Sequence, residues 1–551
     1  TSLNSFKLSC NLPYKKSFQC EVTMLVGIKN RIKNNWVVLV ILLLGSFLFI
    51  SASPLYKGNP WVDTNAMLAI GQAWLDGRVP FRDIFEQRGP VLYVYYLVMN
   101  LFSTKGYIGL FIIETLNLIG IWYWEKKTLQ LLQVPSKLQK WLALILPFFL
   151  LSSFSFENGG SPEEFAFFWI LWSFYYLLLF LKTGKLKNYQ VFLIGFGAAL
   201  VFWMKYSLVG AWFIFILVYL LITLKNRYWI EILVKVVSFL LGFLSVTLPL
   251  MVYYQFVKGV PALLKVYFVT NIGAYTQDSG ETGLRQHLYL IVQAINKNFM
   301  AQPIVLVVLT VGVVIAIFYR KEKQAAILVV LTMIFSSLLS YWSLRQDSYI
   351  FLVSVGISGI LLPLAIWDFI VQISTESKIR TKLVIAVAVI MTFAIPPMAN
   401  KFIRYVTPVS SSQNFAAQDL GRYISKQSRK KASTIIYANM VNMGIERFTN
   451  VKYKYYFFET TNLSPQRFPQ QRQSLNYLIE HRKADYVVWG LTWGNRPPID
   501  LKNKAAVISQ VSPIVTRHYK LVKVGTEMRP WIDPPFLTPA NQDQYALFAR
   551  K

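Results

Sequence analysis

Long apolar runs recur along this sequence and constrain its fold more than any other feature. One of them, VVLVILLLGSFLFISAS, covers residues 37–53 without a single charged residue. A helix needs about 20 such residues to cross the hydrocarbon core of a bilayer. The chain as a whole is 55% hydrophobic and 16% aromatic, which is too apolar for a soluble protein of 551 residues. The sequence therefore predicts a polytopic α-helical membrane protein.

We expect about eleven membrane-spanning helices, counted from the apolar runs that are long enough to cross. They cover residues 36–53, 106–124, 141–154, 165–181, 189–204, 207–224, 230–254, 304–318, 326–341, 349–371 and 383–397. The run 89–102 is short and aromatic, so it fits either a span or a helix in the membrane interface. If this run does not cross, nearly all basic clusters between spans fall on the cytoplasmic side, as the positive-inside tendency favours. If it crossed, the later clusters would face outward. We therefore predict that it is interfacial and that the amino terminus is cytoplasmic.

The formal net charge of +30 arises from 56 basic and 26 acidic residues. Most of the basic residues lie in short clusters between apolar runs and in the carboxyl-terminal tail, so topology and contact with anionic membrane lipids explain them better than nucleic acid. The only two cysteines, Cys10 and Cys20, precede Met24, where we expect translation to begin. The three histidines lie far apart in the sequence. We therefore predict no metal site built from cysteine or histidine.

The composition becomes mixed and polar from about residue 399. Strand-like runs occur at 433–438, 484–490 and 544–551, and helical patterning occurs at 416–427 and 474–482. These patterns predict a small extracytoplasmic α/β domain. The expected organisation is a cytoplasmic segment 1–35 (of which 1–23 precede Met24), a transmembrane domain 36–398 with its first external loop at 54–105, and a soluble domain 399–551.

Charged residues gather at four places on the predicted external face. They are the first external loop (residues 54–105), the segment FENGGSPEE (156–164), the turn at Lys205 and the segment LRQDSY (344–349). Charges close to a membrane are costly unless they are solvated or functional. In the first loop, apolar residues recur at helical spacing after Asp63, which predicts an amphipathic helix lying on the bilayer. These four places supply the candidate site residues.

The first loop resembles the first external loop of the GT-C glycosyltransferases, in the branch with the protein O-mannosyltransferases and the lipid A aminoarabinose transferases. The similarity rests on Asp63 soon after the first span, a helix that leads to GRVPFRD, Arg88 followed by Gly-Pro, and the aromatic segment VLYVYY that contains Tyr93. Similar features follow in SPEEFAFFWILW, in Lys205 after GFGAALVFWM, in Arg345 and Tyr349 before a late span, and in the tail YALFARK. Thr64 departs from the pattern, because many relatives carry Glu there.

The resemblance implies an inverting membrane transferase that takes a sugar from a polyprenyl phosphate, undecaprenyl phosphate in bacteria. The acceptor would be a cell-wall polymer, a glycolipid or a protein at the outer face of the plasma membrane. Such a reaction needs a cation for the phosphate and a carboxylate for the proton of the acceptor hydroxyl. No cofactor is predicted, and a divalent cation stays open because some members of the superfamily use one.

Ten residues form the predicted site. The predicted base is Asp63, and the further catalytic carboxylates, which would position the acceptor or support Asp63, are Glu163 and Glu164. The predicted cations for the phosphate are Arg88, Lys205 and Arg345. The predicted supporting residues are Asp83 and Glu86, which would orient Arg88 through ion pairs, together with Tyr93 and Tyr349.

Plainer interpretations exist for these residues. Asp63 could cap a helix, Arg88 and Lys205 could extend toward lipid head groups, and Glu163 and Glu164 could lie in a solvated loop.

Two other classes of protein also remain open. A transporter or flippase of a lipid-linked saccharide usually has charges within its spans and internal repeats, whereas the spans here are nearly free of charge apart from Glu114. A non-catalytic protein that binds a cell-wall polymer is the other alternative. The 23 basic and 9 acidic residues from Lys401 onward would suit an anionic polymer, although the first-loop pattern argues against this alternative.

Overall fold

The computed structural model describes residues 34–225, 229–275, 283–396, 415–439, 441–459, 463, 465–492, 498–528 and 542–551. The predicted start at Met24, the two cysteines and the predicted domain boundary at residue 399 lie outside these ranges.

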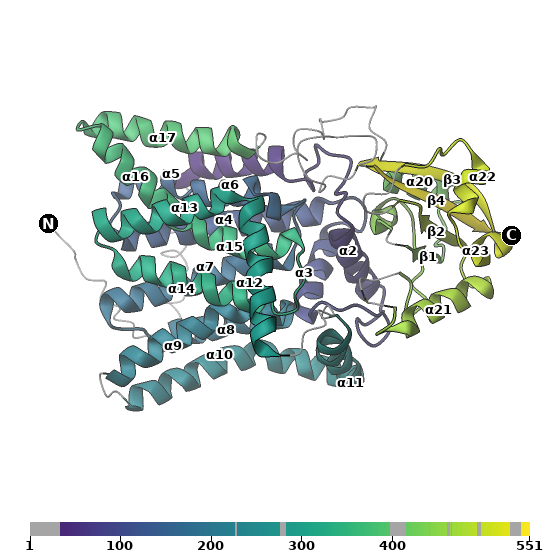
Figure 1. Cartoon of the computed structure of the whole chain (residues 1–551), viewed down its shortest axis with the longest axis horizontal. Coiled ribbons are helices and arrows are strands. Elements are labelled where there is room, and N and C mark those ends of the chain that lie inside the picture. The colour runs from purple at the N-terminus through teal and green to yellow at the C-terminus, as the bar shows by residue number, and fades with distance from the viewer. Residues whose placement is uncertain are drawn as a thin grey trace, which may run out of the picture.

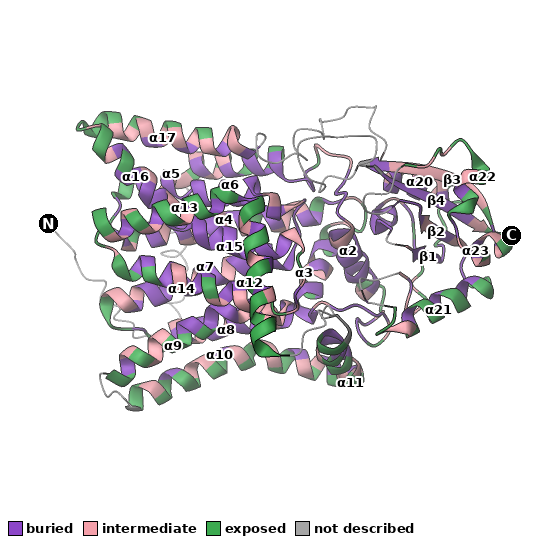
Figure 2. Ribbon diagram, in the orientation of Figure 1, coloured by how far each residue is buried: buried purple, intermediate pink, exposed green. Residues whose placement is uncertain are grey.

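Helices running side by side form a bundle over most of the chain (Figure 1). Its members are the helix Asn34–Phe49, α4 (Ile108–Leu131), α5 (Ser136–Leu142), α6 (Ile145–Ser152), α7 (Pro162–Thr183), α8 (Asn188–Met204), α9 (Gly210–Lys225), α10 (Trp229–Phe256), α13 (Pro303–Val314), α14 (Lys323–Ser340), α15 (Leu352–Gly359), α16 (Leu362–Ile373) and α17 (Ser377–Phe393). Apolar side chains on the rim of the bundle are exposed, for example along α10 (Figure 2). Such a surface suits contact with lipid chains.

Six of the described helical segments are long and apolar enough to cross a membrane. They are Ile108–Leu131, Pro162–Thr183, Tyr206–Lys225, Ile230–Phe256, Lys323–Ser340 and Ser348–Ile373. A seventh results if α12 (Leu284–Ala301) and the helix Pro303–Tyr319, which meet at a 93° bend, count as one span. The other predicted spans correspond to shorter or interrupted helices, such as α5 and α6, and these also run along the bundle (Figure 1). The fold is therefore that of a multi-pass helical membrane protein, as predicted.

Short elements lie at one end of the bundle, next to the carboxyl-terminal domain. They are α2 (Val62–Leu75), α3 (Pro90–Phe102), α11 (Val260–Leu264) and the π-helical segment Lys265–Tyr275. At 1.5 Å per residue, the 13 residues of α3 span roughly 20 Å, less than a bilayer core. Whether this run crosses the membrane stays a prediction. Helix α12 lies across the bundle at the same end (Figure 1).

Helix α2 differs from its prediction as an amphipathic helix on the bilayer surface. Every residue from Thr64 to Ala73 is buried. The helix packs against α3 and against the 3-10 helix Met443–Phe448 of the carboxyl-terminal domain. The spacing of its apolar residues therefore reflects burial between two parts of the protein rather than contact with lipid.

The carboxyl-terminal part forms the predicted α/β domain. Its elements are α20 (Ala416–Gln427), β1 (Ile435–Ala438), α21 (Pro469–Glu480), β2 (Tyr486–Gly490), α22 (Lys504–Ser509), α23 (Pro513–His518), β3 (Tyr519–Met528) and β4 (Gln542–Arg550). The strand order is β1-β2-β4-β3, with β1 parallel to β2 and the other pairs antiparallel. Strand β3 was not predicted from the sequence. The side chains of Leu475, Val487 and Phe548 belong to one apolar core of this domain.

Buried polar contacts join the domain to α2 and α3. Arg447 donates to Gln72 Oε1 at 2.5 Å and to Asn100 Oδ1 at 2.8 Å. Asn65 donates to Asn442 Oδ1 at 2.7 Å. Because all five side chains are buried, each contact satisfies a group that would otherwise lack water. The junction therefore fixes the domain at the end of the bundle.

Candidate active site

A cavity of about 550 Å³ lies where the bundle end, the first loop and the carboxyl-terminal domain meet. Its lining comes from segments that are far apart in the sequence, including α2, the turn after α8, the π-helical segment and the loop after α14. Six of the ten predicted site residues line it, namely Asp63, Glu86, Arg88, Lys205, Arg345 and Tyr349. Pro162 of the segment FENGGSPEE also lines the cavity, so the structure places residues from all four predicted charged segments around it.

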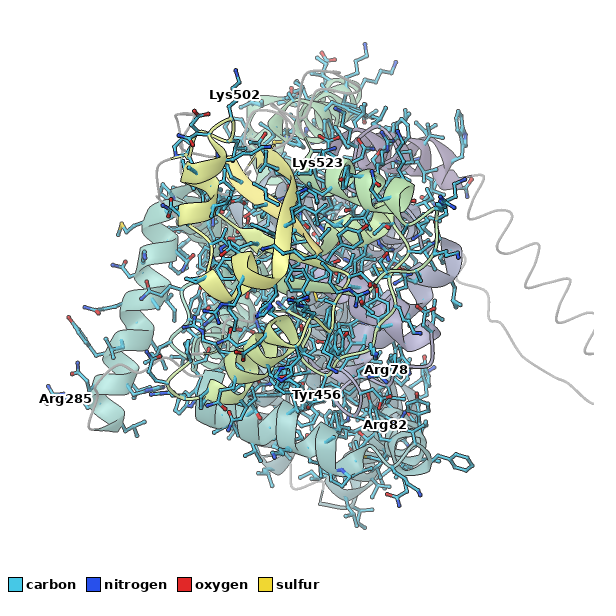
Figure 3. The ribbon with its side chains drawn as sticks, turned by 90° about the vertical axis from the view of Figure 1, so that its right-hand side faces the viewer. Arg78, Arg82, Arg285, Tyr456, Lys502 and Lys523 are labelled. Atoms are coloured by element: carbon cyan, nitrogen blue, oxygen red, sulfur yellow. The ribbon has the colours of Figure 1, made fainter. Side chains whose placement is uncertain are left out.

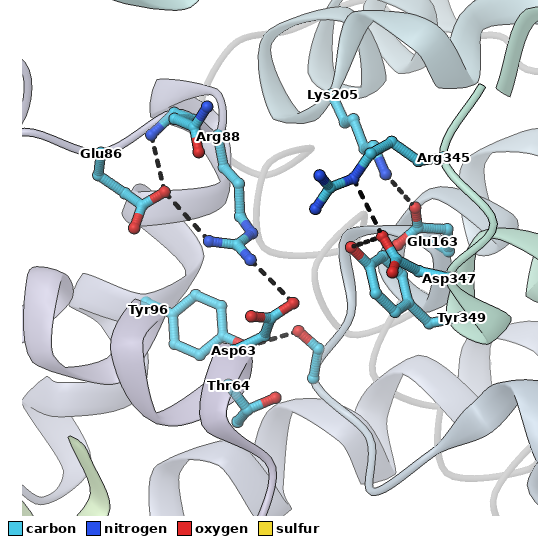
Figure 4. Close-up of polar contacts among 12 residues, drawn as sticks. Asp63, Thr64, Glu86, Arg88, Tyr96, Glu163, Lys205, Arg345, Asp347 and Tyr349 are labelled. Carbon is cyan, nitrogen blue, oxygen red and sulfur yellow. Dashed lines mark hydrogen bonds and ion pairs between the residues drawn. The ribbon is translucent and has the colours of Figure 1, made fainter. Parts of the chain in front are cut away.

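Arg88 connects two carboxylates on one side of this cavity (Figure 4). Its Nη2 lies 2.9 Å from Asp63 Oδ2, and its Nη1 lies 3.1 Å from Glu86 Oε1. The backbone N–H of Gln87 also donates to Glu86 Oε1, at 2.7 Å. Burial acts to lower the pKa of Arg88, but the Asp63 and Glu86 carboxylates raise it well above its ordinary value. The guanidinium is therefore held as a permanent cation.

A second group of charges lies across the cavity (Figure 4). Lys205 Nζ lies 2.5 Å from Glu163 Oε1 and 5.3 Å from the centre of the Tyr349 ring. Arg345 Nε lies 3.4 Å from Asp347 Oδ2, which also accepts from the Tyr349 hydroxyl at 3.4 Å. Each of these two cations therefore has a carboxylate beside it, as Arg88 does.

The two groups are held together by a direct backbone contact. The N–H of Gly89 donates to the carbonyl of Met204 at 3.0 Å. Gly89 follows Arg88 and precedes α3, while Met204 ends α8 just before Lys205. Pro90 begins α3, where the missing N–H of a proline costs nothing. The start of one helix and the end of another thus set the spacing of the two cations.

Glu163 and Glu164 lie in the first turn of α7 rather than in a solvated loop. Ser161 accepts the N–H of Glu164 at 3.0 Å and so caps this helix. Both glutamates are buried. Glu163 faces Lys205, whereas Glu164 accepts the Gly160 N–H at 2.8 Å and lies near Glu114. Of the two, Glu163 is the one that contacts a residue lining the cavity.

Two expectations from the sequence change in the structure. The plainer interpretation of Asp63 as a helix cap is wrong, because Trp61 occupies that position and makes no side-chain cap bond. Asp83 does not orient Arg88. It pairs instead with Arg82 at 2.6 Å and accepts the Val79 N–H at 2.9 Å.

The remaining predicted residue, Tyr93, is fully buried behind the cavity. Its ring lies 5.9 Å from that of Phe81. Tyr93 therefore supports the first loop by packing and does not line the cavity.

Two acidic residues near the cavity were missed in the sequence. Glu459 of the carboxyl-terminal domain lines it, and burial together with nearby Glu86 raises the pKa of Glu459 well above its ordinary value. Glu157 accepts a hydrogen bond from Ser348, and burial raises the pKa of Glu157 to about 8. Glu157 lies within the charged segment FENGGSPEE, which was a usable signal. Glu459 had none, since nothing in its local sequence indicates that the domain reaches the cavity.

Within the part of the chain that the structure describes, no group of three or more histidine, cysteine, aspartate or glutamate side chains could hold a metal ion.

The fold is similar to that of solved membrane-protein structures. The sequence matches no protein-family model, and no curated protein is significantly similar to it. Among solved structures, it is similar to the crystal structure of ArnT from Cupriavidus metallidurans bound to undecaprenyl phosphate, with 11% identity, a TM-score of 0.53 and coverage of 94% of this chain and 97% of that one. The apo form of ArnT aligns with 10% identity, a TM-score of 0.51 and coverage of 95% and 98%. The chain therefore has a fold similar to that of ArnT.

Proposed function

We propose that this protein is an inverting glycosyltransferase that uses a sugar carried on a polyprenyl phosphate. The observation that carries the proposal is the cavity at the bundle end, which is lined by the carboxylate of Asp63 and by the cations Arg88, Lys205 and Arg345. A lipid-linked donor has its prenyl chain in the bilayer and its phosphate at the membrane surface, so it needs a charged cavity at that surface. The similarity of fold to ArnT, whose structure holds undecaprenyl phosphate, supports a donor of this class.

Arg88 is the candidate for holding the donor phosphate, with Lys205 and Arg345 as further cations. A guanidinium can bind two phosphate oxygens at once, which fixes the orientation of the group as well as its position. Apolar residues line the same cavity and would suit the first prenyl units of the lipid, namely Met67, Ile272, Leu339 and Ile350. The cavity thus combines cations for a phosphate with an apolar wall for a lipid chain.

Asp63 is the candidate general base. The acceptor hydroxyl oxygen attacks the anomeric carbon on the face opposite the phosphate, so the configuration inverts. The new glycosidic bond forms as the bond from that carbon to the phosphate oxygen breaks, and the phosphate leaves with the electron pair. Asp63 takes the hydroxyl proton, while the cations stabilise the charge on the leaving phosphate. A phosphate bound to Arg88 would compete for the 2.9 Å ion pair and free Asp63 for this role.

We place the reaction at the outer face of a bacterial plasma membrane. The distribution of basic clusters between spans supports this orientation, with the amino terminus in the cytoplasm. The acceptor would be a cell-wall polymer, a glycolipid or a protein. Val441 and Glu459 belong to the carboxyl-terminal domain and line the cavity, so an acceptor that enters beside them contacts this domain.

The proposal is tested by supplying membranes that contain the protein with radiolabelled undecaprenyl-phosphate sugars. The wild-type protein is expected to transfer label to an extracytoplasmic acceptor. Asp63→Asn keeps the size of the side chain but removes its basicity, and we expect transfer to fall by at least about 100-fold. Asp76→Asn is the matched control, because Asp76 is an exposed residue at the other end of α2. It should transfer at the wild-type rate.

Two outcomes would contradict the proposal in different ways. Undiminished transfer by Asp63→Asn would remove Asp63 as the base while leaving the transferase function intact. Failure of the wild-type protein with every donor, accompanied by movement of the labelled lipid across the bilayer, would favour the flippase alternative.

A further inference from the structure

The carboxyl-terminal domain exposes many cations and few carboxylates. Its exposed acidic residues in the described ranges are Glu480 and Asp500. Its exposed basic residues are Arg422, Lys426, Arg429, Lys430, Lys431, Lys452, Lys454, Arg467, Arg472, Arg482, Lys483, Lys502, Lys504, Arg517, Lys520, Arg550 and Lys551. This excess of exposed basic over exposed acidic residues gives the domain surface a positive electrostatic potential.

The acidic residues that could balance this surface lie mostly inside the domain. Glu446, Glu527 and Asp543 are buried. Glu527 accepts from Asn442 Nδ2 at 2.5 Å, and Tyr453 donates its hydroxyl to Glu446. Burial raises the pKa of Glu527 to about 8 and that of Glu446 to about 7. Glu527 is therefore mostly neutral at pH 7, and Glu446 is only about half ionised.

One group of exposed cations lies where the chain after α21, the end of α23 and the ends of β3 and β4 meet. We call it the outer patch, and its members are Arg482, Lys483, Arg517, Lys520, Arg550 and Lys551. Backbone contacts hold it together. Arg550 Nη1 donates to the carbonyl of Arg482 at 3.3 Å, and Lys551 Nζ donates to the carbonyl of Arg517 at 3.2 Å.

A single carboxylate is paired with the outer patch among the described residues. Asp485 Oδ1 lies 3.1 Å from Arg550 Nη2. Like charges held this close repel one another and lower stability unless a counter-charge is present. A cluster of six cations beside one paired carboxylate therefore indicates an anionic partner.

The location of the outer patch argues against membrane lipid as that partner. Helix α23 and the chain end lie at the extremity of the domain farthest from the bundle (Figure 1). The potential of a membrane surface falls off within a Debye length of about 8 Å at physiological salt. Figure 3 looks onto this extremity and shows Lys502 and Lys523 on the same face of the domain. The outer patch, which includes Arg517 of α23 and Lys551 at the chain end, therefore lies on the side of the domain away from the bundle.

We propose that the outer patch binds an anionic glycan chain whose charges are phosphodiester or carboxylate groups, and that this glycan is the acceptor. Tyr477 is 54% exposed and packs against His481 in a tilted arrangement with ring centres 4.1 Å apart, next to Arg482. An exposed ring beside cations suits a chain of alternating sugar and anion, because the ring contacts the sugar face while the cations pair with the anions. The role as acceptor rests on the proposed transferase function, whereas the binding itself does not.

The binding is tested without turnover, so its failure is distinguishable from failure of the transferase proposal. The full chain is placed in nanodiscs of phosphatidylcholine, and dissociation constants are measured for poly(glycerol phosphate), polygalacturonate and neutral dextran. We expect at least one polyanion to bind at least about tenfold more tightly than dextran, with an affinity that falls as salt rises. The two polyanions distinguish phosphodiester from carboxylate chemistry.

A triple variant, Arg482→Gln with Lys483→Gln and Lys520→Gln, should weaken polyanion binding by at least about tenfold. The matched control removes the same charge from exposed lysines on loops and a helix of the bundle, as Lys185→Gln with Lys321→Gln and Lys382→Gln. It should bind like the wild type.

Equal loss in both variants, or no preference over dextran, would overturn the proposal. Tighter binding to vesicles of phosphatidylglycerol than to either polyanion, abolished by the outer-patch variant, would assign the patch to lipid instead.

Discussion

Arg88 contacts two carboxylates at the cavity. It joins Asp63 of α2 to Glu86 of its own loop. We expect Arg88→Gln to weaken binding of undecaprenyl phosphate by at least about tenfold, because a neutral amide cannot replace a bidentate cation. The measurement is the dissociation constant of the lipid phosphate for the purified protein. Arg88→Lys keeps the charge and should restore part of the affinity.

The control for this prediction is Arg82→Gln. Arg82 is exposed, pairs with Asp83 and lies outside the cavity lining. Its removal should change the dissociation constant by less than about twofold, in line with the small contribution of surface ion pairs. Equal losses in both variants would mean that the phosphate is attracted by the general positive field and not by Arg88.

Residues in short charged loops were the most predictable part of the site. Asp63, Arg88 and Lys205 each follow or precede an apolar run, so their position at a membrane surface can be read from the sequence. Their pairing could not be read in full, since Lys205 takes Glu163 as its partner and Asp83 takes Arg82. Glu459 could not be predicted because its place depends on how the domain docks onto the bundle.

At the scale of elements, the contact between α3 and α8 sets the geometry of the cavity. A Cβ atom at Gly89 would lie 2.0 Å from the carbonyl oxygen of Trp203, so the backbones must separate to admit any side chain. We expect Gly89→Ala to move Arg88 away from Lys205 and to reduce transfer by about 100-fold, because a shift near 1 Å can cost that much. The measurement is the rate of transfer at saturating donor, with thermal unfolding recorded in parallel.

The control for this second prediction is Gly283→Ala. A Cβ atom at Gly283 meets no other atom within 4 Å, although this glycine also precedes a helix. The Gly283→Ala variant should therefore transfer at the wild-type rate. If the Gly89→Ala protein unfolded at a much lower temperature as well as transferring more slowly, the contact between Gly89 and the end of α8 would be assigned to stability. Its role in spacing the cations would then be unsupported.

The sequence predicted whether a segment forms a helix or a strand better than it predicted what that segment packs against. The limits of α20 agree with the predicted helix 416–427, since its apolar residues repeat once per turn. Helix α2 was also predicted as a helix, yet its burial was missed because the domain that covers it comes far later in the chain. Strand β3 was missed because a register shift between Leu521 and Lys523 interrupts its alternation.

At the scale of the whole molecule, the orientation in the membrane remains a prediction. In a background with Cys10→Ser and Cys20→Ser, we expect Thr104→Cys to react with an impermeant thiol reagent added outside intact cells. Thr104 is exposed in the turn between α3 and α4. The measurement is labelling before and after the cells are opened.

Lys321→Cys provides the opposite case. Lys321 is exposed in the basic turn between α13 and α14, which the positive-inside tendency places in the cytoplasm. It should react only after the cells are opened. The reverse pattern for the two positions would place the cavity and the carboxyl-terminal domain on the cytoplasmic side and so exclude an outer acceptor.

The carboxylates that accompany the cations of the cavity bear on turnover. A donor phosphodiester carries one negative charge, whereas the lipid phosphate left after transfer carries nearly two. Unopposed cations would therefore hold the spent carrier more tightly than the fresh donor and would slow each cycle. Asp63 and Glu86 beside Arg88, and Glu163 beside Lys205, compete with the phosphate for the same cations. We expect this competition to speed release of the spent lipid phosphate. The ion pairs around Arg88 and Lys205 would then influence the turnover rate as well as donor binding.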